Sequence, residues 1–263
     1  MTVVIATQLR PDRLDHLTAM YESLTRQSVP WEAVIALDGA DRTRLPTPLA
    51  EDSRVCILAL PRQVGAACAR NLALGCVRTE FVNWADDDDE FTDDAMAVRL
   101  RTLEMTGLGW CAGYSEDLHP DGTTSLWRCP TPPGRHAAGD VWTYWTRPED
   151  TIPIGPTTIL ARTDLVRAAP MGGLVQGEDY MAAIGVTCLA PGILLPVPVY
   201  RYRKHPGQMT RQDGYDVLEP GARRHAWNYG RSLRATLSGR EILGSAIPWT
   251  FPRDHGHRLD TSA

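Results

Sequence analysis

Short apolar runs alternate with helical patterns along the first hundred residues, and this alternation constrains the fold more than any other feature. The runs are four to six residues long and lie at Val3–Ala6, Val34–Leu37, Val55–Leu60 and Phe81–Trp84. Apolar residues recur at helical spacing after Leu14, and small residues predict a second helix over Ala66–Cys76. Strands that alternate with helices in this way predict parallel βαβ units, in a sheet that helices cover on both faces.

The second half of the chain has a different texture, rich in Gly, Pro, Trp and Thr between Trp110 and Pro156. We expect a smaller mixed β portion there, with short strands near 110–114 and 125–127. The later elements expected are a strand leading into a short helix within 157–165, a helix over 179–184, a strand over 196–203 and a basic helix over 220–237. The fold class is therefore α/β, with a Rossmann-like, mostly parallel central sheet. Aromatic residues such as Trp142 suit either ligand stacking or the core, and we favour the core.

The charge balance and cysteine pattern argue against several classes of protein. The formal net charge is −5 and the isoelectric point about 5.8, whereas a nucleic-acid-binding protein usually presents a basic surface. The apolar run at Val3–Ala6 is too short for a signal-peptide core or a membrane span. Six cysteines form no C-x-x-C pair, so we expect small buried side chains rather than zinc ligands. These features predict a cytoplasmic protein without a nucleic-acid partner or an integral membrane segment.

Four consecutive aspartates, Asp86–Asp89, directly follow the apolar run Phe81–Trp84. Two carboxylates 4 Å apart repel by about 4 kcal/mol at an effective dielectric constant near 20, so such a cluster gains from a divalent cation. Oxygen ligands suit Mg²⁺ or Mn²⁺, and either ion would neutralise charge on a departing diphosphate. The alternative is a solvated acidic turn that begins a helix. Thr92, Asp93 and Asp94 fit that simpler description, as an N-cap with acidic first-turn residues.

Three further segments carry candidate site residues, each with a simpler structural alternative. Gly65 begins a small-residue helix that contains Arg70; its guanidinium suits a phosphate or carboxylate, although such helices also serve close packing on a sheet. Glu178 and Asp179 lie at a helix start, where a carboxylate either acts as a general base or merely favours the helix dipole. His205 follows a strand, as a ligand or as an exposed side chain.

Taken in order, six segments resemble the motifs of a single enzyme family. The first is V-V-I-P-T-Y-N-R-P-x-R-L, which residues 3–14 resemble, and the second is an apolar strand ending in D-G-S, at residues 35–40. The third is N-x-G-x-x-x-A-R-N, at residues 63–71, and the fourth is a strand carrying D-x-D-D-x-W, at residues 81–91. The last two are G-G-F…G-E-D-Y, at residues 171–180, and R-x-H-x-G, at residues 203–207. The family that they resemble is the inverting GT-A glycosyltransferases of family 2, in the nucleotide-diphospho-sugar transferase superfamily. The resemblance spans residues 1–212.

This resemblance implies a nucleotide-sugar site at the strand ends. Thr7 and Asp38 would contact the nucleoside, with Asp38 accepting hydrogen bonds from the base. Asp86 would lie near the ribose, and Arg70 would hold the nucleotide or order Asp86. The other residues implied at this site are Asp87, Glu178 and Arg203. Ligand sites in open α/β sheets lie beyond the carboxyl ends of the strands, which agrees with this placement.

The resemblance also implies the chemistry. Asp88 and His205 would bind a divalent metal, Mn²⁺ or Mg²⁺, under the diphosphate. Asp179 would be the catalytic base that removes the acceptor's proton during a single displacement with inversion. The donor would be a UDP-, dTDP- or GDP-sugar, and the acceptor a hydroxyl or amine of a small molecule or saccharide.

The implied domain is residues 1–212, with 1–105 as its nucleotide-binding half and 106–212 as its acceptor-binding half, followed by a helix and tail over 213–263. Gln8 replaces the family's usual aromatic residue, and Asp87 stands at a usually neutral position, so the metal assignment among Asp86–Asp88 stays open. Two other functions are considered. A sugar nucleotidyltransferase needs a glycine-rich loop after the first strand, which residues 7–11 lack. A non-catalytic nucleotide-sugar-binding protein could share the same fold.

Overall fold

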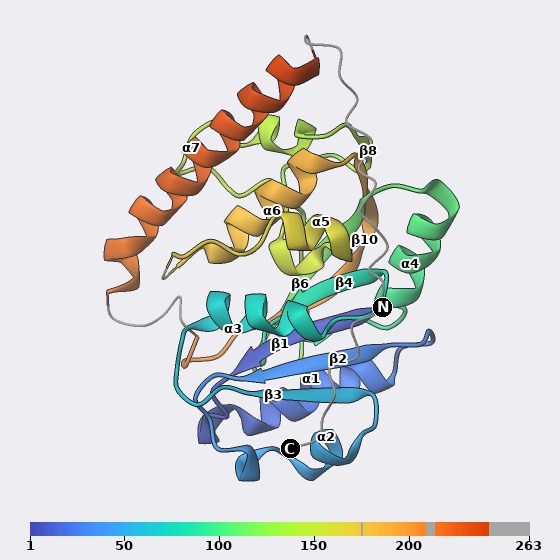
Figure 1. Ribbon diagram of the computed structural model, residues 1–263, viewed down its shortest axis with the longest axis vertical. Helices are drawn as coiled ribbons and strands as arrows, with labels where there is room; N and C mark the ends of the chain where they lie inside the picture. The colour runs from blue at the N-terminus through green and yellow to red at the C-terminus, as the bar shows by residue number, and fades with distance from the viewer. Residues whose placement is uncertain (175, 209–213, 242–263) are drawn as a thin grey trace, which may run out of the picture.

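The computed structural model describes residues 1–174, 176–208 and 214–241, and its centre is one twisted sheet flanked by helices (Figure 1). The strands are β1 (Thr2–Thr7), β2 (Glu32–Leu37), β3 (Val55–Ala59), β4 (Phe81–Ala85), β5 (Glu90–Phe91), β6 (Trp110–Leu118), β7 (Thr124–Trp127), β8 (Gly134–His136), β9 (Leu160–Arg162) and β10 (Gly192–Arg203). Their order across the sheet is β3-β2-β1-β4-β9-β6-β10-β5, with β7 beside β6 and β8 beside β10.

The sheet is parallel in its first half and mixed in its second half. β1 pairs in parallel with β2 and β4, and β2 pairs in parallel with β3. β9 then runs antiparallel to both β4 and β6, whereas β6 and β10 are parallel. The α/β class with a mostly parallel central sheet and a smaller mixed portion is therefore confirmed.

Helices cover both faces of the sheet, as the alternating pattern predicts (Figure 1). They are α1 (Leu14–Thr25), α2 (Thr47–Glu51), α3 (Ala66–Ala73), α4 (Ala95–Thr106), α5 (Thr163–Ala168), α6 (Glu178–Leu189) and α7 (Tyr215–Glu241). Short 3-10 helices include Pro11–Arg13, Leu74–Cys76, Asp140–Tyr144 and Pro156–Thr158. The helix predicted from residue 220 begins five residues earlier and packs on α6, while the tail beyond 241 lies outside the described residues. No described helix is long and apolar enough to cross a membrane.

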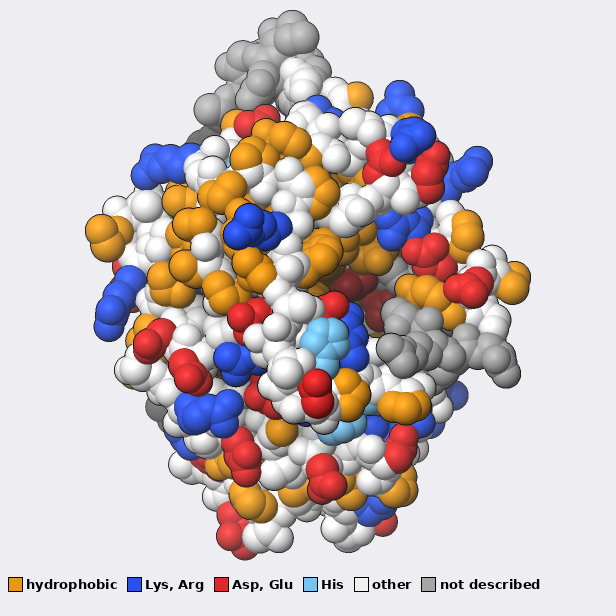
Figure 2. Space-filling view, turned by 180° about the vertical axis from the view of Figure 1, so that it is seen from behind, with side chains coloured by type: hydrophobic (Ala, Val, Ile, Leu, Met, Phe, Trp, Pro, Cys, Tyr) orange, Lys and Arg blue, Asp and Glu red, His pale blue; other side chains and the backbone are white. Residues whose placement is uncertain are grey.

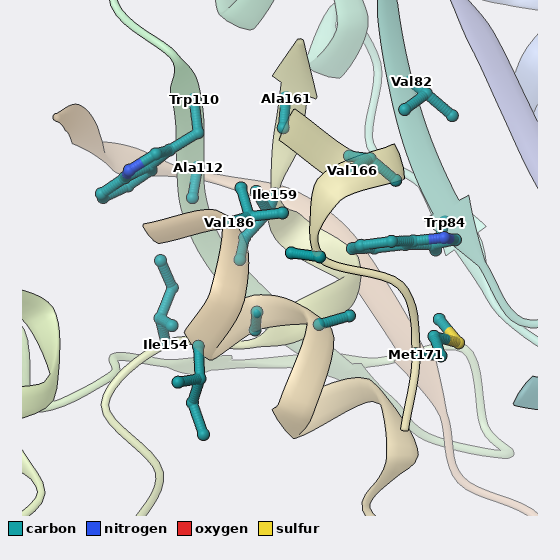
Figure 3. Close-up of a cluster of buried hydrophobic side chains, with 14 of the residues drawn as sticks. Val82, Trp84, Trp110, Ala112, Ile154, Ile159, Ala161, Val166, Met171 and Val186 are labelled. Carbon is teal, nitrogen blue, oxygen red and sulfur yellow. The ribbon is translucent and has the colours of Figure 1, made fainter. Parts of the chain in front are cut away.

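The strands divide their side chains between two buried clusters, one on each face. In β1, Val4 and Ala6 belong to one cluster, and Val3 and Ile5 belong to the other. Figure 3 shows part of the first cluster, in which side chains of β4, β6 and β9 face those of α5 and α6. Because both faces are covered, polar groups of the central strands reach solvent mainly at the strand ends.

Trp142 belongs to the core, as expected. Its side chain is buried, and its indole N–H donates a 2.6 Å hydrogen bond to the Thr187 hydroxyl on α6. The cysteines are free, but the expectation that all six are buried is wrong for Cys56 and Cys68, which are exposed, and for Cys76, which is partly exposed. Cys56 faces outward because it lies on β3, the strand at the edge of the sheet.

The expected capping turn before α4 is also wrong. Asp94 immediately precedes the helix in a left-handed conformation, with φ of 57°, and its side chain caps nothing. Its carboxylate instead accepts a 3.0 Å hydrogen bond from the Ser28 hydroxyl. The cap comes from another segment, because the side-chain carbonyl of Gln27 accepts a 3.0 Å hydrogen bond from the Met96 N–H. A long-range partner thus replaces the local cap that sequence spacing indicates.

Candidate active site

The residues predicted at the strand ends converge on one edge of the sheet. Thr7 ends β1, Asp38 follows β2, and Asp86 follows β4. Parallel pairing aligns these three strands, and the Asp38 N–H donates a 2.8 Å hydrogen bond to the Thr7 carbonyl. The carboxyl ends of parallel strands meet at the same edge of the sheet, so these three residues lie close together.

The first two aspartates of the run find different partners. Asp86 pairs with Arg70 of α3, whose buried guanidinium also lies 3.7 Å from Glu178. Asp87 accepts a 2.6 Å hydrogen bond from the Thr7 hydroxyl. Burial raises the pKa of Asp87 to about 6, although that hydrogen bond opposes the shift. The acidic run is therefore no solvated turn, because its members are tied to separate elements.

Asp88 lies against His205, the other residue predicted to bind the metal ion. His205 Nε2 is 2.9 Å from Asp88 Oδ2, and both side chains are nearly buried. The same carboxylate oxygen lies 3.1 Å from Arg13 Nη1. The His16 ring packs against the His205 ring, with ring centroids 4.7 Å apart. Two potential metal ligands and one resident guanidinium thus share this corner of the site.

Asp89 and Arg203 hold the turn in shape rather than facing outward. Asp89 is buried, and its carboxylate accepts a 2.9 Å hydrogen bond from the Arg203 N–H. The Arg203 guanidinium donates a 3.0 Å hydrogen bond to the Asp88 carbonyl and pairs with Glu90. The Tyr200 hydroxyl accepts a 2.9 Å hydrogen bond from the Asp86 N–H. Strand β10 therefore fixes the conformation of the turn that carries Asp88.

Asp38 makes contacts that the sequence did not indicate. Its two carboxylate oxygens accept hydrogen bonds of 2.6 Å and 3.1 Å from the Val64 and Gly65 N–H groups. Gly65 has a φ of 90°, a conformation that glycine adopts without strain. The carboxylate thereby anchors the loop that begins α3, the helix that carries Arg70.

Glu178 and Asp179 begin α6 on the far side of Arg70. Gly177 precedes them with a φ of 69°, and the Asp179 carboxylate accepts a 2.9 Å hydrogen bond from the Tyr180 N–H. Burial, together with the nearby carboxylates of Glu178 and Asp86, raises the pKa of Asp179 to about 7. A carboxyl with such a pKa can exchange a proton near neutral pH, as a general base requires.

The shape of the surface agrees with a site at this edge. Figure 2 shows a hollow with acidic side chains at its floor and hydrophobic side chains along its upper rim. A separate cavity of about 610 Å³ lies at the opposite ends of β1 and β2, where it is lined by residues that include Met1, Trp31 and Arg54. None of the predicted site residues lines that cavity, so the converging carboxylates decide the location of the site.

Comparison with a protein-family model identifies the family of this chain. The model of glycosyl transferase family 2 matches residues 2–150, more than half of the chain. The chain belongs to glycosyl transferase family 2. Human beta-1,4 N-acetylgalactosaminyltransferase 1 is 31% identical over 142 residues, which are 53% of this chain and 25% of that protein. The chain therefore spans about a quarter of the length of this curated relative.

Solved structures show the same GT-A fold. Residues 1–349 of TarS from S. aureus, in complex with UDP-GlcNAc, superpose with a TM-score of 0.63 over 93% of this chain and 73% of that chain, at 15% identity. Another structure of the same TarS fragment has a TM-score of 0.62 over 94% of this chain and 75% of that chain, at 14% identity. At these identities the likeness concerns the fold.

In this family 2 chain, the ten predicted site residues occupy one connected region. One group links Thr7 to Asp87, and another links Asp88 to His205 and, through its carbonyl, to Arg203. A third links Asp86, Arg70 and Glu178, with Asp179 next in sequence. Asp38 lies beside Thr7 and anchors the α3 loop. Their roles toward a ligand remain predictions.

The donor set is compatible with a divalent cation. No group of three or more His, Cys, Asp and Glu side chains capable of holding an ion occurs among the described residues. Asp88 and His205 supply two potential ligands in direct contact. Mg²⁺ is commonly bound by one or two carboxylates, with the remaining oxygens supplied by substrate phosphates and water. The residues present thus fit an ion that binds together with a diphosphate.

Two residues at this edge were not singled out as site residues from the sequence. Arg13 ends the 3-10 helix Pro11–Arg13 after β1, and only the structure shows its side chain beside Asp88. Asn71 clamps the loop before α6, because its side-chain amide donates to and accepts from the Met171 backbone, both at 3.0 Å. Its place next to Arg70, in the segment 63–71 that resembles N-x-G-x-x-x-A-R-N, was the available signal.

The raised pKa of the half-buried Asp179 carboxyl predicts a pH-dependent cost in the free energy of unfolding. A carboxyl whose pKa is raised in the folded state binds its proton more tightly there than in the unfolded state, so the folded state loses stability as the pH rises. This loss grows from about pH 4 to pH 7 and is complete above pH 7. Asp179→Asn should therefore increase the free energy of unfolding by about 2 kcal/mol more at pH 8 than at pH 4.5, after allowance for partial exposure. Urea unfolding at the two pH values measures this difference. An equal effect at both pH values would show that the carboxyl has an ordinary pKa.

Proposed function

We propose that this chain is a metal-dependent, inverting glycosyltransferase that transfers a sugar from a nucleoside diphosphate to an acceptor hydroxyl or amine. The observation that carries the proposal is the connected set of acidic groups at one sheet edge. It runs from Asp88 and His205, which suit a metal ion, through Asp86, Arg70 and Glu178, to a carboxyl with a pKa of about 7. Binding and proton transfer are thereby assigned to different carboxylates of one surface.

The donor proposed for the first tests is a UDP-linked N-acetylhexosamine. A TarS structure holds UDP-GlcNAc, and the human relative is named as an N-acetylgalactosaminyltransferase. The fold shared with TarS and membership of family 2 support a nucleotide-sugar donor for this chain. They also disfavour the sugar nucleotidyltransferase alternative.

In the proposed reaction, Asp179 takes the proton of the acceptor hydroxyl or amine. The acceptor atom attacks the anomeric carbon from the face opposite the diphosphate, the bond from that carbon to the diphosphate oxygen breaks, and the nucleoside diphosphate leaves with the bond's electron pair. Inversion follows because there is a single displacement. Asp88 and His205 would hold the metal ion, which when bound neutralises charge on the diphosphate. Arg70 keeps Asp86 and Glu178 from repelling each other, since it lies between them.

Asp88→Asn should weaken Mn²⁺-dependent UDP binding by at least about tenfold, because the amide keeps the shape of the side chain but loses the charge that attracts the ion. Calorimetric titration of UDP with and without Mn²⁺ measures the effect. Asp93→Asn is the matched control, since this carboxylate lies seven residues from Asp86 on the chain and is 74% exposed. Wild-type affinity in Asp88→Asn would assign the metal to other ligands.

Asp179→Asn should leave UDP binding nearly intact and lower kcat by about 10² to 10⁴, the usual contribution of a general base. In the wild-type protein kcat should rise as the pH passes about 7, because only the ionised carboxyl accepts a proton. The rate of UDP release from the donor measures kcat and its dependence on pH. Asp164→Asn on α5 is the control for an exposed carboxylate. A fully active Asp179→Asn variant would remove this residue from the mechanism. Donor binding without turnover in the wild type would instead support the non-catalytic alternative.

A further inference from the structure

Arg13 already pairs with Asp88, the carboxylate that the proposed metal ion would need. It ends the 3-10 helix Pro11–Arg13 after β1, and its side chain is only 14% exposed. A guanidinium at this depth needs anionic or carbonyl partners, because burial without them costs free energy. The site supplies these partners on two sides.

Arg13 contacts both segments that carry the proposed metal ligands, the Asp86–Asp89 turn and the turn that contains His205. Nη1 lies 3.1 Å from Asp88 Oδ2 and 3.7 Å from Asp87 Oδ1. Nη2 donates a hydrogen bond to the Gly207 carbonyl, in the turn that also carries His205. His205 Nε2 lies 2.9 Å from the same Oδ2 atom of Asp88. Arg13 and His205 therefore share one carboxylate oxygen of Asp88.

A divalent cation on Asp88 cannot leave this arrangement unchanged. The ion and the guanidinium are both positive, and like charges a few ångströms apart in a partly buried site are weakly screened. We propose that Arg13 is the resident counter-ion of Asp88, which a divalent cation displaces, and that the freed guanidinium then binds the diphosphate of the donor. This inference rests on the proposed function, since it assumes that an ion and a diphosphate meet at Asp88.

The diphosphate is the natural second partner for the displaced side chain. An arginine presents several N–H donors in a planar fork that matches phosphate oxygens. Arg13 Nε is buried and has no hydrogen-bond partner among the residues that the structure describes. The exchange keeps the guanidinium paired with an anion in both states, once with Asp88 and once with the donor.

The test compares Mn²⁺ and UDP binding in charge-removing and charge-keeping variants. Arg13→Gln retains an N–H donor for Gly207 but loses the charge, so Mn²⁺ should bind the nucleotide-free variant about tenfold more tightly than the wild type. At saturating Mn²⁺ the same variant should bind UDP about tenfold more weakly. Arg13→Lys keeps the charge and should leave Mn²⁺ affinity close to wild type. Electron paramagnetic resonance measures free Mn²⁺, and calorimetry measures UDP.

Arg10→Gln is the matched control, because Arg10 lies three residues earlier on the chain, its side chain is 39% exposed, and among the described residues it pairs only with Asp12. It should change neither affinity. Unaltered Mn²⁺ affinity in Arg13→Gln, or unaltered UDP affinity at saturating Mn²⁺, would overturn the role of Arg13 while leaving the proposed function standing. Mn²⁺ binding that does not depend on Asp88, shown with Asp88→Asn, would instead overturn the metal site itself. Thermal unfolding confirms that each variant is folded.

Discussion

Repulsion within the Asp86–Asp89 turn is the constraint on which the site depends. Four consecutive carboxylates at the end of a buried strand are unfavourable unless each finds a separate partner. The structure provides these partners from different elements: Arg70 of α3 for Asp86, the Thr7 hydroxyl of β1 for Asp87, His205 and Arg13 for Asp88, and the Arg203 backbone of β10 for Asp89. The acidic turn thus organises its surroundings.

These partners come from both halves of the chain, so the turn also joins them. Asp86 reaches α6 through Arg70 and Glu178, and the Arg203 side chain returns from β10 to the Asp88 carbonyl. Asn71 adds a clamp between α3 and the loop that leads into α6. Strands from both halves of the chain also lie in one sheet, in which β4 of the first half pairs with β9 of the second.

The sequence predicted the strand ends well and the side-chain partners poorly, for physical reasons. Parallel strands place their carboxyl ends together whatever their side chains, so Thr7, Asp38 and Asp86 could be assigned to one edge from the alternation alone. The partners of Asp38 and Asp94 could not be foreseen. Asp38 anchors the Val64–Gly65 backbone, and Gln27 takes the capping role expected near Asp94; both contacts depend on how distant segments pack. Arg13 was missed for the same reason, because its neighbour Asp88 is 75 residues away on the chain.

A crystal of the protein grown with Mn²⁺ and UDP would show whether one edge of the sheet holds an ion and a diphosphate together, because manganese can be located by its anomalous scattering. We expect a manganese peak in contact with Asp88 and His205, with the diphosphate bound to the same ion. A manganese peak elsewhere, or a nucleotide in the cavity beside Trp31 and Arg54, would rule out this site.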